Sequence, residues 1–335
     1  MKKRIYGALI GLAGLGVGLM LGACSVAPVG DAARDPQAEL TLAGAPVPPS
    51  ALIAHMTESE ALGAFSDTVR YESIDDPRKL QQGVEAGRIH AGMASTSALA
   101  VMRNEGAPIQ LLDVFGWELL YVLAGEKEID DWESLRGSKV AVPYRGSVSD
   151  VIFNRLATEA GLNVGDDLVM RYASNPLQAA EVLAGKQVQA AILGEPWATV
   201  AIADGVEEGE PVHRVMNLQE EWGALLGTEA RIPQVAFFVT DALAAEHPDI
   251  VQALREALFE AAAWAAAEPE RAAAEAARLT RLSQEVTAES LANTGIEVVP
   301  AAQVRTELEQ FFQVLADADP TLIGDALPDD GFYGE

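Results

Sequence analysis

The sequence predicts an α/β protein with mixed, mostly parallel sheets, arranged as two lobes with a helical C-terminal region. Over residues 39–240, short apolar runs alternate with segments whose apolar residues recur every three to four positions, which is typical of strands alternating with helices. Beyond Asp241 the chain reads as helical, apart from an irregular tail at 327–333. The chain has 335 residues. Because this exceeds what one hydrophobic core usually holds, we expect two lobes.

The N-terminus has the pattern of a secretory signal peptide. A basic segment at 2–4 precedes an uncharged, apolar and glycine-rich stretch at 5–20, and Leu21-Gly22-Ala23-Cys24 follows. These four residues resemble the lipobox of bacterial lipoproteins, which implies cleavage before Cys24 and a lipid on its thiol. The alternative is an uncleaved membrane anchor, since residues 5–23 are just long enough to span a bilayer. We therefore predict a signal peptide at 1–23, a flexible tether at 24–38, and a location outside the cytoplasmic membrane, on the periplasmic or cell-surface side.

The composition restricts the chemistry. The chain has 23 Lys and Arg against 50 Asp and Glu. The predicted signal peptide carries three of the basic residues and none of the acidic ones. Cleavage therefore leaves 20 basic against 50 acidic residues, a net charge of −30. Nucleic acid is therefore excluded as an expected partner. Cys24 is the sole cysteine. An exported domain with one cysteine has no disulfide within the chain and no thiol chemistry once that cysteine carries lipid.

The first part of the folded chain reads as strands that each lead through a polar turn into a helix. A strand at 40–43 is followed by a proline-rich turn and a helix from Ser50 to about Leu62. The next segments are a strand at 68–74, a helix to Ala86, a strand at 89–94 and a helix opened by Ser95-Thr96-Ser97. Two apolar runs, 109–115 and 118–123, flank Gly116-Trp117.

The stretch from Val140 to Ala157 reads as strand, tight turn and helix. The run 140–142 stops at Pro143, Arg145-Gly146-Ser147 turns the chain, and apolar residues then recur at helical spacing. If Ser147 or Ser149 caps this helix, free N–H groups and Arg145 favour a small anion there. The alternative is an ordinary strand-to-helix turn with a solvated arginine.

The remaining elements continue the alternation and then become helical. We predict strands at 168–172, 212–218 and 235–240, a strand that ends at Gly194, and an acidic loop at 205–210. Three helices follow, at 248–264, 269–282 and 301–316.

Three segments together resemble substrate-binding proteins of ABC importers, in the NMT1/THI5-like, SsuA-type group that handles nitrate, sulfonates, taurine and thiamine precursors. They are LRGSKVAVPYRGSVSDVIFNRLATEAGL at 135–162, VLAGKQVQAAILGEPWAT at 182–199 and VAFFVTDALAAEHPDIVQAL at 235–254. The resemblance covers nearly all of residues 39–335. It implies a type II periplasmic-binding fold with two lobes, residues 39–127 plus 233–335 and residues 128–232, joined by crossings near 123–130 and 228–236.

The resemblance also implies a ligand cleft between the lobes, walled by loops at the carboxyl ends of strands, as open α/β sheets generally place their ligands. Carried over position by position, the expected ligand-binding residues are Pro46, Val47, Ser95, Thr96, Ser97, Gly116, Trp117, Arg145, Gly146, Ser147, Ser174, Asn175 and Glu195. Ordinary turn chemistry is the alternative for each of them.

The charge of the ligand stays open at the level of the sequence. Arg145 favours an anion, Glu195 favours a cation or a hydrogen-bond donor, and Trp117 and Trp197 suit an aromatic ring or a cationic head group. We expect Arg145 and Glu195 to face the same space. A sulfonate-, nitrate- or taurine-like solute and a pyrimidine-type solute both remain possible.

The expected function is therefore a lipid-anchored, monomeric solute-binding component that delivers a small molecule to an ABC permease and its ATPase. An exported sensor that signals to a membrane partner has the same cleft and tether. An enzyme on the same fold is the third reading, but His55, His90, His213 and His247 are widely separated and no nucleophile with its base is recognisable. We expect no cofactor, no metal and no catalytic residue.

Overall fold

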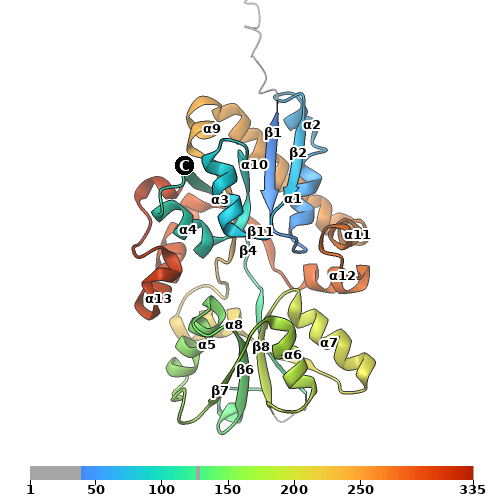
Figure 1. Cartoon of the computed structure of the whole chain (residues 1–335), viewed down its shortest axis with the longest axis vertical. Coiled ribbons are helices and arrows are strands. Elements are labelled where there is room, and N and C mark those ends of the chain that lie inside the picture. Colours follow the sequence, from blue (N-terminus) through green and yellow to red (C-terminus); the bar gives the residue numbers. More distant parts are fainter. Residues whose placement is uncertain (1–38, 126–128, 335) are drawn as a thin grey trace, which may run out of the picture. The chain divides into compact units, whose positions relative to one another are not determined.

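The computed structural model describes residues 39–125 and 129–334. The predicted signal peptide, the lipidation residue Cys24 and the tether lie outside the described residues. Two sheets organise the described part of the chain (Figure 1). We call the six-stranded sheet with the helices that cover it the first lobe, and the five-stranded sheet with its helices the second lobe.

The first lobe contains a mixed sheet with the strand order β11-β4-β10-β3-β1-β2. β1 pairs in parallel with β2 and β3, whereas β10 runs antiparallel to β3 and β4, and β11 antiparallel to β4. The strands are β1 (Leu40–Gly44), β2 (Val69–Ser73), β3 (Ala91–Ser95), β4 (Ile109–Gly116), β10 (Val235–Thr240) and β11 (Ile296–Pro300). The helices are α1 (Ser50–Met56), α2 (Glu60–Gly63), α3 (Pro77–Glu85), α4 (Thr96–Asn104), α9 (Asp241–Glu246), α10 (Pro248–Ala267), α11 (Pro269–Thr280), α12 (Gln284–Ala292) and α13 (Arg305–Ala318).

The second lobe repeats the arrangement with the strand order β7-β6-β8-β5-β9. β6 pairs in parallel with β7 and β8, and β5 is antiparallel to β8 and β9. The strands are β5 (Leu120–Ala124), β6 (Lys139–Pro143), β7 (Val169–Ala173), β8 (Ala190–Gly194) and β9 (His213–Asn217). The helices are α5 (Val148–Glu159), α6 (Pro176–Ala184), α7 (Trp197–Glu208) and α8 (Leu218–Leu226).

The prediction of mixed α/β sheets is confirmed, but parallel pairing does not dominate. Only β2-β1-β3 and β7-β6-β8 are parallel, because β5 and β10, which carry the chain from one sheet to the other, enter from the opposite direction. β5 also differs from the expected lobe boundary at residue 127. It pairs within the second lobe, so the chain leaves the first sheet between Gly116 and Leu120. It returns between Leu226 and Val235.

Three local predictions need correction. The single helix expected from Ser50 to Leu62 is two short helices, α1 and α2. The acidic segment expected as a loop at 205–210 continues α7 as far as Glu208, and the helix then ends at Gly209, whose left-handed φ of 77° suits glycine. The expectation that the chain is helical beyond Asp241 is wrong at β11, which pairs with β4, and α12 precedes it where no element was predicted.

The lobes are in contact through the C-terminal helices. α13 packs on α5, and the rings of Trp222 on α8 and Phe311 on α13 lie edge to face with centroids 6.1 Å apart. α12 packs on α7, and Figure 1 shows this contact on the opposite side of the crossing strands from α13. Within the part of the chain that is described, no helix has both the length and the apolar character needed to cross a membrane.

Candidate ligand cleft

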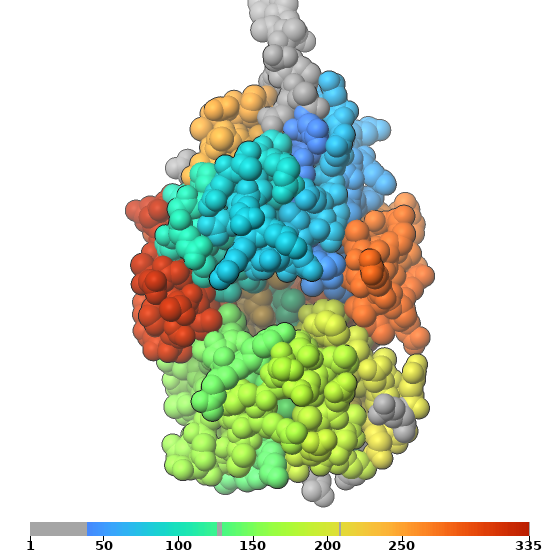
Figure 2. Space-filling view, in the orientation of Figure 1, coloured from blue at the N-terminus to red at the C-terminus, as the bar shows by residue number. Residues whose placement is uncertain are grey.

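A cavity of about 280 Å³ lies where the two lobes face each other. Figure 2 shows this face of the molecule hollowed between the blue and cyan surface of the first lobe and the yellow-green surface of the second. The cavity is lined by Ala45, Val47, Pro49, Ile74, Asp75, Pro77, Leu80, Met93, Ala94, Ser95, Ala98, Leu119, Glu195, Val235, Ser290 and Thr294.

The cavity is built from the carboxyl ends of parallel strands. Val47 follows β1, Asp75 follows β2 and Ser95 ends β3, while Glu195 follows β8 of the second lobe. This is the edge at which open α/β sheets place their ligands. A larger cavity, of about 480 Å³, lies beside Ser138 and Gln189 at the amino ends of β6 and β8, and its described lining comes from the second lobe alone. Position therefore favours the cavity between the lobes.

Some of the predicted ligand-binding residues line this cavity. Val47, Ser95 and Glu195 do so, and Pro46 stands between two lining residues. Thr96 and Ser97 begin α4, beside the cavity rather than in its wall. Thr96 is buried and its hydroxyl donates to the carbonyl of Pro233 at 2.6 Å. Ligand contact by these residues stays a prediction.

Gly116 and Trp117 support the crossing rather than the cavity wall. A Cβ on Gly116 would lie 2.8 Å from the Cβ of Val235, so glycine permits the close approach of β10. Trp117 is buried; its Nε1 donates to the carbonyl of Glu297 at 2.7 Å, and the guanidinium of Arg231 lies 4.4 Å from its ring centroid. Trp197 is 37% exposed at the start of α7 and is not a lining residue.

The turn at 145–147 is not in the wall of the cavity either. Ser147 caps α5, as predicted, by accepting from the backbone N–H of Asp150 at 3.3 Å. The carboxylate of Asp150 accepts from the N–H of Gly146 at 2.8 Å, so a side chain of the protein itself takes up an amide expected to be free for an anion. The guanidinium of Arg145 lies over the ring of Tyr172, 4.4 Å from its centroid.

The last predicted pair, Ser174 and Asn175, lies exposed at the start of α6. Asn175 caps that helix by accepting from the N–H of Gln178 at 2.8 Å. These two residues and the turn at 145–147 each occupy the N-terminus of a helix of the second lobe, and the structure does not bring them together with Glu195 in one cavity.

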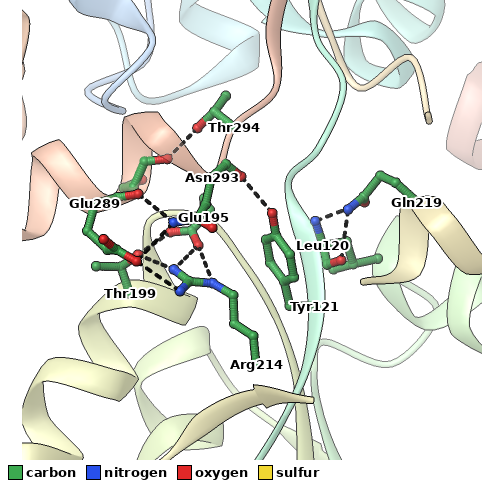
Figure 3. Close-up of polar contacts among 10 residues, drawn as sticks. Leu120, Tyr121, Glu195, Thr199, Arg214, Gln219, Glu289, Asn293 and Thr294 are labelled. Carbon is green, nitrogen blue, oxygen red and sulfur yellow. Dashed lines mark hydrogen bonds and ion pairs between the residues drawn. The ribbon is translucent and has the colours of Figure 1, made fainter. Parts of the chain in front are cut away.

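Glu195 is instead paired with Arg214 of β9, which is a correction to the expectation that it faces Arg145 (Figure 3). The Nη2 of Arg214 lies 2.6 Å from the Oε1 of Glu195, and the hydroxyl of Thr199 donates to Oε2 at 2.8 Å. The side chain of Glu195 is only 2% exposed. Burial raises the pKa of this carboxyl above its ordinary value, and the hydrogen bonds from Arg214 and Thr199 oppose the shift.

The same arginine connects the lobes. Its Nη1 lies 3.2 Å from the Oε1 of Glu289 on α12, so one guanidinium links carboxylates of both lobes. Beside it, the hydroxyl of Tyr121 donates to the carbonyl of Asn293 at 2.9 Å, another bond from the second lobe to the first. Figure 3 shows both bridges converging next to Glu195.

The start of β5 is held by a buried amide. Gln219 accepts from the N–H of Leu120 at 3.0 Å and donates to its carbonyl at 3.1 Å, so the side chain replaces a strand partner where the chain enters the second lobe. Among the described residues, no group of three His, Cys, Asp or Glu is placed to hold a metal ion.

A model of the NMT1-like family matches residues 81–280. The chain belongs to the NMT1-like family. No curated protein sequence matches it. Among solved structures, an ABC transporter from Parabacteroides distasonis is 18% identical, with a TM-score of 0.73, covering 90% of this chain and 99% of that one.

Two further neighbours of this NMT1-like protein are binding proteins by name. The periplasmic aliphatic sulphonate binding protein SsuA from Escherichia coli is 17% identical, with a TM-score of 0.65 and coverage of 83% of this chain and 87% of that one. The periplasmic nitrate-binding protein NrtA from Synechocystis is 14% identical, with a TM-score of 0.58 and coverage of 84% and 85%. At these identities the likeness establishes the fold, which is that of type II periplasmic-binding proteins, as predicted.

Several cleft residues were not recognised in the sequence. Asp75 follows a predicted strand just as Pro46 and Ser95 do, so the carboxyl-end rule was sufficient to find it. Arg214 lies in a predicted strand, where nothing in the local sequence distinguishes it from other polar residues. Its partners Glu195 and Glu289 are 19 and 75 residues away along the chain. Ser290 and Thr294 belong to a segment, at and just after α12, for which no element was predicted.

Proposed function

We propose that this protein is the lipid-anchored, exported solute-binding component of an ABC importer, which captures a small solute between its lobes and presents it to a permease and its ATPase. The observation that carries the proposal is the cavity at the carboxyl ends of the strands, with walls from both lobes. Membership of the NMT1-like family and the fold shared with sulphonate- and nitrate-binding proteins support it.

Closure around a solute is the physical step that this function needs. A ligand that contacts both lobes favours the closed arrangement by the difference between its affinities for the closed and open states. Glu195 is the second-lobe member of the cavity wall, and the Arg214–Glu289 pair joins the lobes beside it. We therefore place the ligand against Glu195 and treat the inter-lobe bonds as contacts that break on opening.

Thermal shift of the mature chain against a broad library of small solutes tests the proposal. A ligand present at one hundred times its Kd stabilises the folded state by about 2.7 kcal/mol, which raises the Tm measurably. We expect at least one small solute to do so. If none does, while a macromolecular partner stabilises the chain, the proposed function is wrong.

Two matched variants locate the site. Ala98 lines the cavity between the lobes and Ala184 lines the larger cavity of the second lobe. Ala98→Trp fills the first cavity and should abolish the ligand-induced shift, whereas Ala184→Trp should retain it. The opposite pattern would move the binding site to the second lobe.

The anchor is tested separately. We expect cells that express the full chain to incorporate radiolabelled palmitate into it, and Cys24→Ala to remove the label. Labelling that survives this replacement would contradict lipidation at Cys24.

A further inference from the structure

The chemistry of the cavity wall restricts the ligand that fits it. Most of the lining side chains are apolar, and none of the described lining residues is Lys, Arg or His. The ionisable members are two carboxylates, Asp75 from the first lobe and Glu195 from the second. A site for a sulfonate or nitrate needs cationic or N–H donors directed at the anion, and this lining supplies no cation.

Asp75 contributes a negative charge that no described residue neutralises. It is exposed at the carboxyl end of β2 and takes part in none of the ion pairs or side-chain hydrogen bonds found among the described residues. An unpaired carboxylate at the edge of an apolar cavity attracts cations and repels anions, because the apolar walls weaken screening by water.

Glu195 lies in a cluster whose charge is also negative. Arg214 is shared between Glu195 and Glu289, so three ionised groups leave one negative charge in excess. The guanidinium is therefore already occupied by two carboxylates and is not among the lining residues. A cationic head group near Glu195 would balance the cluster.

Ser290 is a second and independent sign of a ligand. It lines the cavity, is completely buried, and its hydroxyl has no hydrogen-bond partner among the described residues. Leaving a buried hydroxyl unpaired costs about 1 to 3 kcal/mol, and a polar ligand group that donates to it or accepts from it would remove that cost. Its neighbour Thr294 already donates to the carbonyl of Ser290 at 2.7 Å.

We propose that the cavity binds an organic cation, with an apolar body against the walls of the first lobe and a protonated amine directed at the exposed carboxylate of Asp75, in the negative field of the Glu195–Arg214–Glu289 cluster. The inference rests on the proposed solute-binding function and narrows it to one class of solute. The net charge of −27 acts in the same direction, since it draws cations toward the protein and repels anions.

Three matched series of compounds test the inference by thermal shift and isothermal calorimetry on the mature chain. Each series uses the same apolar bodies, for example phenethylamine, 2-phenylethanol and 2-phenylethanesulfonate, with nitrate added as an inorganic anion. We expect binding by members of the amine series, at least tenfold tighter than by their alcohol counterparts, and no binding by nitrate or the sulfonates.

The outcomes separate this inference from the proposed function. Binding of a sulfonate or nitrate, or an alcohol bound as tightly as its amine, would overturn the organic cation and leave the solute-binding function standing. Absence of binding by every class, in this panel and in the wider library, would overturn both.

A charge-matched pair of variants then tests whether the carboxylate of Asp75 binds the amine. Asp75→Asn should weaken binding of the amine at least fivefold. Asp166→Asn removes the same charge from an exposed position outside the cavity and should change the affinity less than twofold. Equal effects of the two variants would show that only the overall charge acts, and would remove Asp75 from the site.

Discussion

Replacing Arg214 with Met tests how the buried carboxylate of Glu195 is held. Arg214 donates to Glu195 through Nε at 3.2 Å and Nη2 at 2.6 Å, and Nη2 also contacts the hydroxyl of Thr199 at 2.6 Å. Met preserves much of the length of the side chain and removes only the charge and the donors. The variant therefore leaves a carboxylate that is 2% exposed without its cation.

The expected loss of stability follows from the burial of the Glu195 side chain. Removing one partner of a buried ion pair costs about 3 to 5 kcal/mol, because the charge that remains is desolvated and unpaired. The hydroxyl of Thr199 still donates to Glu195 and offsets part of this loss. We expect Arg214→Met to lower the free energy of unfolding at pH 7 by about 3 kcal/mol.

Urea denaturation at pH 7 measures the free energy of unfolding of Arg214→Met, and a substitution of a second arginine is the control. Arg305 pairs with Glu309 and Asp330 but is 41% exposed, so Arg305→Met should cost less than about 1 kcal/mol. Adding Glu195→Gln to Arg214→Met removes the orphaned charge and should recover at least about 1 kcal/mol. A loss below about 1 kcal/mol for Arg214→Met, or no recovery in the double variant, would refute the reasoning.

Three further predictions concern separate features. Burial raises the pKa of Asp113 to about 6, and Arg255 opposes the shift. Because this value is above the pKa in the unfolded chain, the folded state holds the proton more tightly, and the free energy of unfolding should fall by about 2 kcal/mol as the pH rises from 4 to 6. Urea melts of Asp113→Asn should lack this fall. Gly92→Ala places a Cβ 2.2 Å from the carbonyl oxygen of Ala43 and should destabilise by about 2 kcal/mol, whereas Gly63→Ala, with nothing within 4 Å, should not destabilise in the same melts. Arg145→Ala should leave the calorimetric affinity for the cavity ligand within twofold, since Arg145 is not in the cavity wall; a tenfold loss would place it in the site.

Local sequence patterns were sufficient to predict most of the strands and helices. Runs of apolar residues predict the strands before Ser95, Arg145 and Asn175. Helical spacing and capping side chains predict the helices after Ser95 and Arg145, and all of these signals act over a few residues. Ser147 caps its helix as predicted. The resemblance to binding proteins, together with the carboxyl-end rule, pointed to Val47, Ser95 and Glu195, which line the cavity. It pointed equally to Arg145 and Asn175, which do not.

What the sequence by itself determined, then, is the alternation of strands and helices, the α/β fold class and the N-terminal export pattern, whereas the expected place of the cleft came from the resemblance to binding proteins. Only the tertiary structure decided the chemistry of that cleft. It paired Glu195 with Arg214, filled the turn at Gly146 with the carboxylate of Asp150, and brought Ser290 into the wall. Capping and periodicity are local, whereas the charge of a site depends on which carboxylates remain unpaired after residues distant in the chain have met.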